Sequence, residues 1–123
     1  MTNLDVRAWA ERIYEVLGPG YNECVYHKAM EVLLRKQGVQ YESERIVPIV
    51  FEGHTIGNVR SDIIVDGSVV LEFKSVRALT DAAALQTRNY LRLTGLCLGY
   101  LINFGHHGLE VVKIEASSEM PVP

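Results

Sequence analysis

The chain has little cysteine, little proline and no long hydrophobic segment. Its 123 residues include two cysteines and four prolines. Cys24 and Cys97 stand far apart, without the paired spacing of a zinc site, so we expect them to be buried, reduced thiols. No apolar run approaches the roughly 18 residues that cross a bilayer, and the N-terminus has no basic segment followed by an apolar one. We therefore expect a soluble protein of the cytoplasm or another intracellular compartment, with no membrane partner.

The chain also lacks an excess of positive charge. Its net charge is −3, whereas a protein that coats nucleic acid is usually basic because it neutralises phosphates. An enzyme that gathers carboxylates around a cation can still be acidic, since the metal supplies positive charge where the substrate lies. Apolar residues make up 48% and charged residues 22%, as in ordinary globular domains. We expect one domain over residues 1–123, with a core from about 4 to 115 and a frayed tail over 116–123.

The periodicity of apolar residues predicts two helices, three strands, a third helix and two further strands. Helical spacing predicts helices over about 4–17, 22–37 and 81–94, each followed by a glycine. Alternating or continuous apolar runs predict strands over five segments: 39–51, 56–65, 69–76, 96–104 and 109–114. This order, ααβββαββ, indicates an α+β fold in which helices flank a central sheet.

Three charged residues interrupt two of the expected strands. Asp62 stands in one strand, and Glu72 and Lys74 stand in the next, where their spacing of two places both on one face. Two carboxylates and a lysine are the groups that metal-dependent phosphodiester hydrolysis uses, because hard cations prefer oxygen ligands. A structural cluster, in which Lys74 neutralises the two carboxylates, is the alternative, and the spacing alone does not separate the two.

The loop between these two strands decides whether such a site can exist. Asp66-Gly67 is a strong hairpin signal, but a plain two-residue loop would pair Asp62 with Leu71 and leave it on the opposite face from Glu72. The site therefore requires a loop with an odd number of residues, or a bulge beside it.

Four motifs, in one order, resemble those of a known nuclease superfamily. Asp62 followed by Glu72-Phe73-Lys74 resembles the D…(D/E)xK signature of the PD-(D/E)XK nuclease superfamily, although Ser61 stands where its name has proline. Residues 86–90, QTRNY, resemble the QxxxY motif of its RecB-like branch. Residues 20–26, GYNECVY, match the motif of the GxxExxY protein family, and residues 99–105 resemble that family's late strand. The resemblance extends from about 18 to 114.

The resemblance implies a restriction-endonuclease-like core, with a mixed central sheet, and a nuclease that uses Mg²⁺ or Mn²⁺. Asp62 and Glu72 would bind the cation, with the carbonyl of Phe73 and the carboxylate of Glu23 as further ligands. Lys74 would position the attacking water or stabilise the phosphorane. The implied catalytic residues are thus Asp62, Glu72, Lys74 and Glu23, and the implied substrate-binding residues are Gln86, Tyr90 and Tyr26.

Several of these assignments have structural alternatives. Glu23, beside the Asn22 cap, could favour the positive end of a helix dipole. Gln86 and Tyr90, four apart on one helical face, could pack against the sheet. For the whole protein, we expect a nuclease acting on DNA rather than RNA. A domain this small offers little surface for gripping duplex DNA, which favours a homodimer or a partner subunit. The alternative is a nuclease fold that has lost catalysis and serves as an interaction module.

Overall fold

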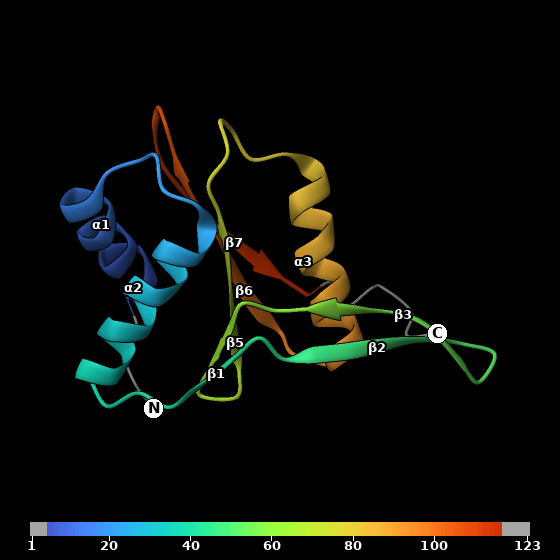
Figure 1. The fold of residues 1–123 in the computed structure, drawn as a ribbon. Coiled ribbons are helices and arrows are strands. Elements are labelled where there is room, and N and C mark those ends of the chain that lie inside the picture. Colours follow the sequence, from blue (N-terminus) through green and yellow to red (C-terminus); the bar gives the residue numbers. More distant parts are fainter. Residues whose placement is uncertain (1–4, 117–123) are drawn as a thin grey trace.

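A five-stranded mixed β-sheet forms the centre of the fold, in a computed structural model that describes residues 5–116 (Figure 1). Its strand order is β1-β4-β5-β6-β7, in which β5 and β6 are parallel and the other neighbours antiparallel. The strands span five segments: β1 Tyr41–Ser43, β4 Ile63–Val65, β5 Val69–Lys74, β6 Leu98–Gly105 and β7 Gly108–Glu115. The expected α+β class with a mixed central sheet is confirmed.

Helices cover both faces of this sheet (Figure 1). α1 (Val6–Leu17) and α2 (Glu23–Lys36) bury their apolar sides against one face, where they share a core with Phe73 of β5. α3 (Asp81–Thr94) packs on the other face, against Val70 of the same strand. Because neighbouring residues of a strand point to opposite faces, β5 contributes to both cores.

Local signals set the ends of α2 and α3 as the sequence predicts, whereas α1 begins at Val6 rather than at about residue 4, because the side chain of Asp5 caps it. The side chain of Asn22 accepts a hydrogen bond from the N–H of Cys24 at the start of α2, and Thr80 accepts one from Ala83 at the start of α3. Gly95 ends α3 at a φ of 76°, a left-handed conformation that glycine adopts without strain.

Two of the expected strands are each divided by a bend. Residues 39–51 form β1 and β2 (Ile46–Phe51), and residues 56–65 belong to β3 (His54–Arg60) and β4. Their pairing continues through the bend, because Glu44 donates its N–H to the carbonyl of Asp62 at 2.8 Å. Glu44 has a φ of 58°, which turns the chain there. The β2–β3 pair therefore leaves the sheet as a two-stranded ribbon beside α3, and the order becomes ααβββββαββ (Figure 1).

Two further expectations concern exposure and the chain ends. Cys24 and Cys97 are both exposed, so the expectation of buried thiols is wrong. Cys24 lies in the first turn of α2 and Cys97 in the link before β6, and neither place faces a core. The frayed tail expected over 116–123 lies, apart from Ala116, outside the described residues. Between residues 5 and 116, no helix is long and apolar enough to span a membrane.

Candidate active site

The hairpin between β4 and β5 brings Asp62 opposite Glu72. Its ladder pairs Ile63 with Leu71, and the same register continued by one residue joins Asp62 to Glu72. Val65 pairs with Val69, so the loop holds three residues. The expected loop of odd length is confirmed.

The loop reaches this odd length by adding one residue to a tight turn. Asp66 and Gly67 have φ values of 55° and 67°, which suit the two central positions of a hairpin turn. Ser68 donates its N–H to the carbonyl of Val65 at 3.0 Å, and the ladder resumes only at Val69. Ser68 is thus the extra residue that sets the register of the site.

Two hydrogen bonds hold the carboxyl groups of Asp62 and Glu72 in place. The N–H of Asp62 donates to Oε2 of Glu72 at 3.2 Å, and the N–H of Phe73 donates to Oδ2 of Asp62 at 2.8 Å. At Asp62 the chain leaves the β4–β5 ladder, so β4 offers no backbone carbonyl to the N–H of Phe73. The carboxylate of Asp62 accepts this hydrogen bond instead. The bend therefore gives Asp62 its position at the end of the sheet.

The environment of Glu72 disfavours its ionised form. Burial raises the pKa of Glu72 to about 8, and the charge of Asp62 adds to this, whereas the hydrogen bond from Asp62 and the charges of Lys74 and Arg60 lower it. In the part of the chain that the structure describes, no ion pair joins Lys74 to either carboxylate within 4.0 Å. The lack of a close ion pair argues against the interpretation in which Lys74 neutralises the two carboxylates for a purely structural purpose.

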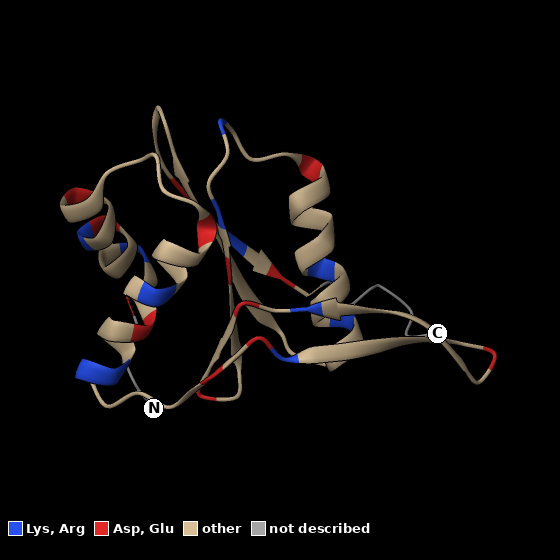
Figure 2. Ribbon diagram, in the orientation of Figure 1, with Lys and Arg blue, Asp and Glu red and all other residues tan. Residues whose placement is uncertain are grey.

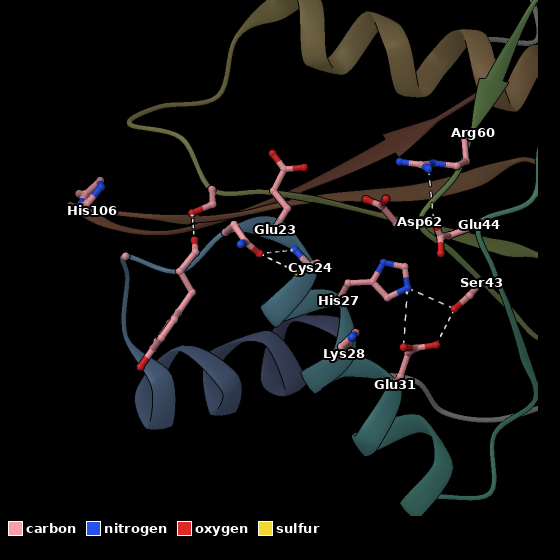
Figure 3. Close-up of a pocket in the computed structure, with 14 residues that line it drawn as sticks. Glu23, Cys24, His27, Lys28, Glu31, Ser43, Glu44, Arg60, Asp62 and His106 are labelled. Carbon is pink, nitrogen blue, oxygen red and sulfur yellow. Dashed lines mark hydrogen bonds and ion pairs between the residues drawn. The ribbon is translucent and has the colours of Figure 1, made fainter.

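A cavity of about 780 Å³ opens beside Asp62. Glu23, the first residue of α2, lines the same cavity, so the helix and the sheet bring these two carboxylates to one space (Figure 3). Over residues 5–116, no three His, Cys, Asp or Glu side chains lie close enough together to hold a metal ion. The Asp62–Glu72 pair is therefore the centre of the site, and Glu23 stands at its border.

Lys74 and Gln86 meet in a second hollow, on the α3 side of the sheet. This hollow has a volume of about 280 Å³, and its lining includes both side chains. Gln86 is exposed on the first half of α3. The structure thus brings together Asp62 with Glu72, Asp62 with Glu23, and Lys74 with Gln86. Asp62 and Lys74 line two different hollows, which share no lining residue among those described.

The two tyrosines of the expected substrate site are buried. Tyr26 is 0% exposed: its hydroxyl donates to the carbonyl of Gly18 at 2.6 Å, and its ring stacks on Phe104. Tyr90 is 3% exposed and belongs to the core under α3. Neither residue presents a surface to a substrate, and the expected contacts have no support in the structure. Tyr26 instead holds the loop that leads into α2.

Residues 2–114 match the family model of the PD-(D/E)XK nuclease superfamily. The chain belongs to this superfamily. A search of curated proteins finds no match. The GxxExxY family and the RecB-like branch, which the motifs indicate, remain predictions.

Two solved structures resemble this superfamily member in fold. The protein SSO0001 is 21% identical over 77% of this chain and 50% of its own, with a TM-score of 0.58, so the chain spans half the length of that protein. An alkaline exonuclease, LHK-Exo from Laribacter hongkongensis, is 12% identical over 95% of this chain and 73% of its own, with a TM-score of 0.51. At these identities the likeness shows the fold.

Several residues of the cavity are not evident from the sequence motifs. His27, Glu31 and Ser43 line it together with Arg60, which pairs with Glu44 at 3.2 Å (Figure 3). A signal for two of them exists, because Glu23, His27 and Glu31 recur every four residues and so share one face of α2. Ser43 and Arg60 reach the cavity only through the bend of the hairpin, which no local pattern predicts.

Asn103 supports the end of the strand that carries Lys74. It is fully buried and pairs with Lys74 across the parallel β5–β6 ladder. Its side chain accepts from the N–H of Val76 at 2.9 Å and donates to the carbonyl of Val76 at 3.0 Å and to Glu110 at 2.8 Å. Asn103 therefore fixes the backbone just after Lys74 in this nuclease fold.

Proposed function

We propose that the protein is a metal-dependent nuclease that hydrolyses phosphodiester bonds of DNA. The observation that carries the proposal is the pair of Asp62 and Glu72, two carboxyl groups that hydrogen bonds hold together at the end of the sheet. Membership of the nuclease superfamily supports it. LHK-Exo, which has a similar fold, is described as an alkaline exonuclease.

The donor set fits a hard cation such as Mg²⁺ or Mn²⁺. Asp62 and Glu72 offer carboxylate oxygens, and the raised pKa of Glu72 marks a group whose charge a cation would neutralise. The carbonyl of Phe73 and the carboxylate of Glu23 are the further ligands that we propose. A divalent cation held there would supply the positive charge that activates water and stabilises the developing negative charge.

Lys74 acts in this proposal as a donor to the reacting oxygens. An ammonium has three N–H donors and no lone pair, so it orients the water or stabilises the phosphorane without binding the metal. The water oxygen forms the new bond to phosphorus as the bond to the leaving oxygen breaks. One proton of the water passes to solvent, and the leaving oxygen takes one proton, so the products are a phosphate monoester and an alcohol.

Basic residues beside the site suit a nucleic-acid strand. Figure 2 shows basic residues on α3 and on the β2–β3 ribbon, while basic and acidic residues are mixed on α1 and α2. Arg60 lies on the ribbon and lines the cavity next to Asp62, where its guanidinium can contact a phosphate. Gln86, exposed beside Lys74, is the second substrate contact that we propose.

Cleavage of labelled single-stranded DNA, duplex DNA and RNA, each with Mn²⁺, Mg²⁺ or EDTA, tests the function. We expect wild type to cut DNA with a metal ion and not with EDTA, and Asp62→Ala to be inactive. The product lengths separate exonuclease from endonuclease action, and sedimentation with bound DNA shows whether one copy, two copies or a further subunit is needed. No cleavage of DNA by a folded, metal-loaded protein would refute the proposal and favour an interaction module; cleavage of RNA alone would refute the substrate.

A further inference from the structure

A chain of three polar side chains runs along the wall of the cavity, from α2 to β1. Nε2 of His27 lies 3.2 Å from Oγ of Ser43, and Oγ of Ser43 donates to Oε2 of Glu31 at 2.6 Å (Figure 3). The side chains of His27 and Glu31 are only 14% and 20% exposed, so packing limits their movement. All three residues line the cavity that also contains Asp62, and the proposed mechanism does not use them.

The directions of these hydrogen bonds fix the tautomer of His27. A serine hydroxyl has one proton, and the 2.6 Å contact with the Glu31 carboxylate uses it, because an ionised carboxylate can only accept. Ser43 can therefore meet His27 only as an acceptor, and Nε2 must carry the imidazole proton. In the neutral ring, Nδ1 then has a free lone pair and acts as an acceptor.

The free nitrogen faces the catalytic side of the cavity. In Figure 3, the ring nitrogen of His27 that makes no hydrogen bond points toward Asp62. The imidazole also packs against the ring of Phe73, with centroids 5.6 Å apart, on the face of β5 opposite to Glu72 and Lys74. Of the three charged site residues, Asp62 is the one that shares this cavity with His27, and the acceptor nitrogen is directed toward it.

The chemistry of the reaction limits what this acceptor can bind. The bridging and non-bridging oxygens of a phosphodiester carry no proton, so a neutral Nδ1 gains no hydrogen bond from them. The attacking water is a donor, and the proposed reaction requires it close to the Asp62–Glu72 pair. A hydrogen bond from this water to Nδ1 would turn a water lone pair away from His27 and toward the phosphorus.

We propose that Nδ1 of His27 accepts a hydrogen bond from the attacking water, which makes His27 a further catalytic residue. Ser43 and Glu31 are positioning residues that hold the ring and its tautomer. The inference rests on the proposed nuclease function and adds to it a second group, besides Lys74, that orients the nucleophile.

Two substitutions of His27 separate this role from a structural one. In His27→Asn, the amide oxygen can occupy the position of Nδ1, whereas the amide of His27→Gln reaches the position of Nε2 and leaves no acceptor at Nδ1. We expect His27→Gln to lower kcat about 100-fold, in the range typical of positioned acid–base groups, with KM and Mn²⁺ affinity unchanged. His27→Asn should retain kcat within about tenfold of wild type. Lys36→Ala, at the exposed end of α2, is the matched control.

The outcomes distinguish this inference from the proposed function. Equal losses in both variants would show a structural role and overturn the inference, as would wild-type kcat in His27→Gln. Loss of Mn²⁺ binding in His27→Gln would make His27 a metal ligand and also overturn it. No cleavage by wild type would overturn the proposed function itself and this inference with it.

A spectroscopic measurement tests the tautomer without any assay of activity. A two-bond ¹H–¹⁵N NMR spectrum of the metal-free protein, recorded where His27 is neutral, identifies the protonated nitrogen. We expect Nε2–H in wild type and a mixture of tautomers in Ser43→Ala, which should also lose part of kcat. An Nδ1–H tautomer in wild type would overturn the inference.

Discussion

The backbone N–H of Phe73 donates to the carboxylate of Asp62 at 2.8 Å. Phe73 lies between Glu72 and Lys74 on β5. The bond therefore ties Asp62, at the bend between β3 and β4, to the strand that carries the other two charged residues. It holds one oxygen of Asp62 and leaves the other free for a ligand.

Lys74→Ala should abolish cleavage and leave Mn²⁺ binding largely intact. An ammonium cannot bind a cation, so its loss removes the donor to the reacting oxygens and nothing from the ligand set. Glu72→Ala should lose both cleavage and Mn²⁺ binding. Isothermal titration with Mn²⁺ and a cleavage assay measure the two properties, and Lys113→Ala, exposed on β7, is the control. Full activity in Lys74→Ala would contradict the assignment.

The metal-free protein should lose stability as the pH rises toward about 8. The pKa of Glu72 is raised from 4.5 to about 8, so between these values the folded state binds more protons than the unfolded state. The free energy of unfolding then falls with pH, by at most about 1.4 kcal/mol per unit for one group. Urea unfolding in EDTA measures this slope. Glu72→Gln should remove it, and an unchanged slope in that variant would show that other groups cause it.

Mn²⁺ binding should release close to one proton at neutral pH and raise the melting temperature. Metal-free Glu72 holds its proton below about pH 8, and a cation must displace it. Saturation at a hundred times Kd adds about 2.7 kcal/mol to the free energy of unfolding, or several degrees in a domain of this size. Titrations in buffers of different ionisation enthalpy count the protons. A melting temperature that does not respond to Mn²⁺ would refute the metal site.

Asp62→Asn should make the metal-free protein at least as stable as wild type above about pH 8, where Glu72 is ionised. The amide keeps an oxygen for the N–H of Phe73 and removes the charge that repels Glu72. It should also remove most of the Mn²⁺ shift and the activity. Thermal melts in EDTA and in Mn²⁺ compare the proteins. A structural ion pair predicts the reverse, a weaker mutant with or without metal.

Asn103→Ala should lower both stability and kcat. The substitution removes the side-chain partners of the part-buried N–H and carbonyl of Val76, and each lost hydrogen bond costs about 0.5 to 1.5 kcal/mol. Because Val76 follows Lys74 by two residues, we expect the lysine to lose its fixed position and kcat to fall more than KM rises. Amide exchange at Val76 reports the loosened backbone. Unchanged exchange at Val76 with unchanged kcat would show that Asn103 does not position Lys74.

Much of the fold follows from signals that act over a few residues. Asn22 and Thr80 cap helices, and Gly95 ends one, because these effects depend on neighbouring backbone groups alone. The charges of Glu72 and Lys74 in an apolar strand mark the site for a similar reason, since the alternation of a strand is local. The requirement for an odd loop before Glu72 also follows from the pleat alone.

The sequence by itself determined the ends of α2 and α3, the identity of the charged strand residues and the register that the site demands. The tertiary structure alone decided where the hairpin bends at Glu44, that Tyr26 is buried rather than exposed to a substrate, and that His27 and Ser43 meet beside Asp62. The physical reason is the distance along the sequence over which each kind of interaction acts. Caps and turns are set by hydrogen bonds within a few residues, whereas bends and cavity walls are set by the packing of helices on a sheet formed by distant segments.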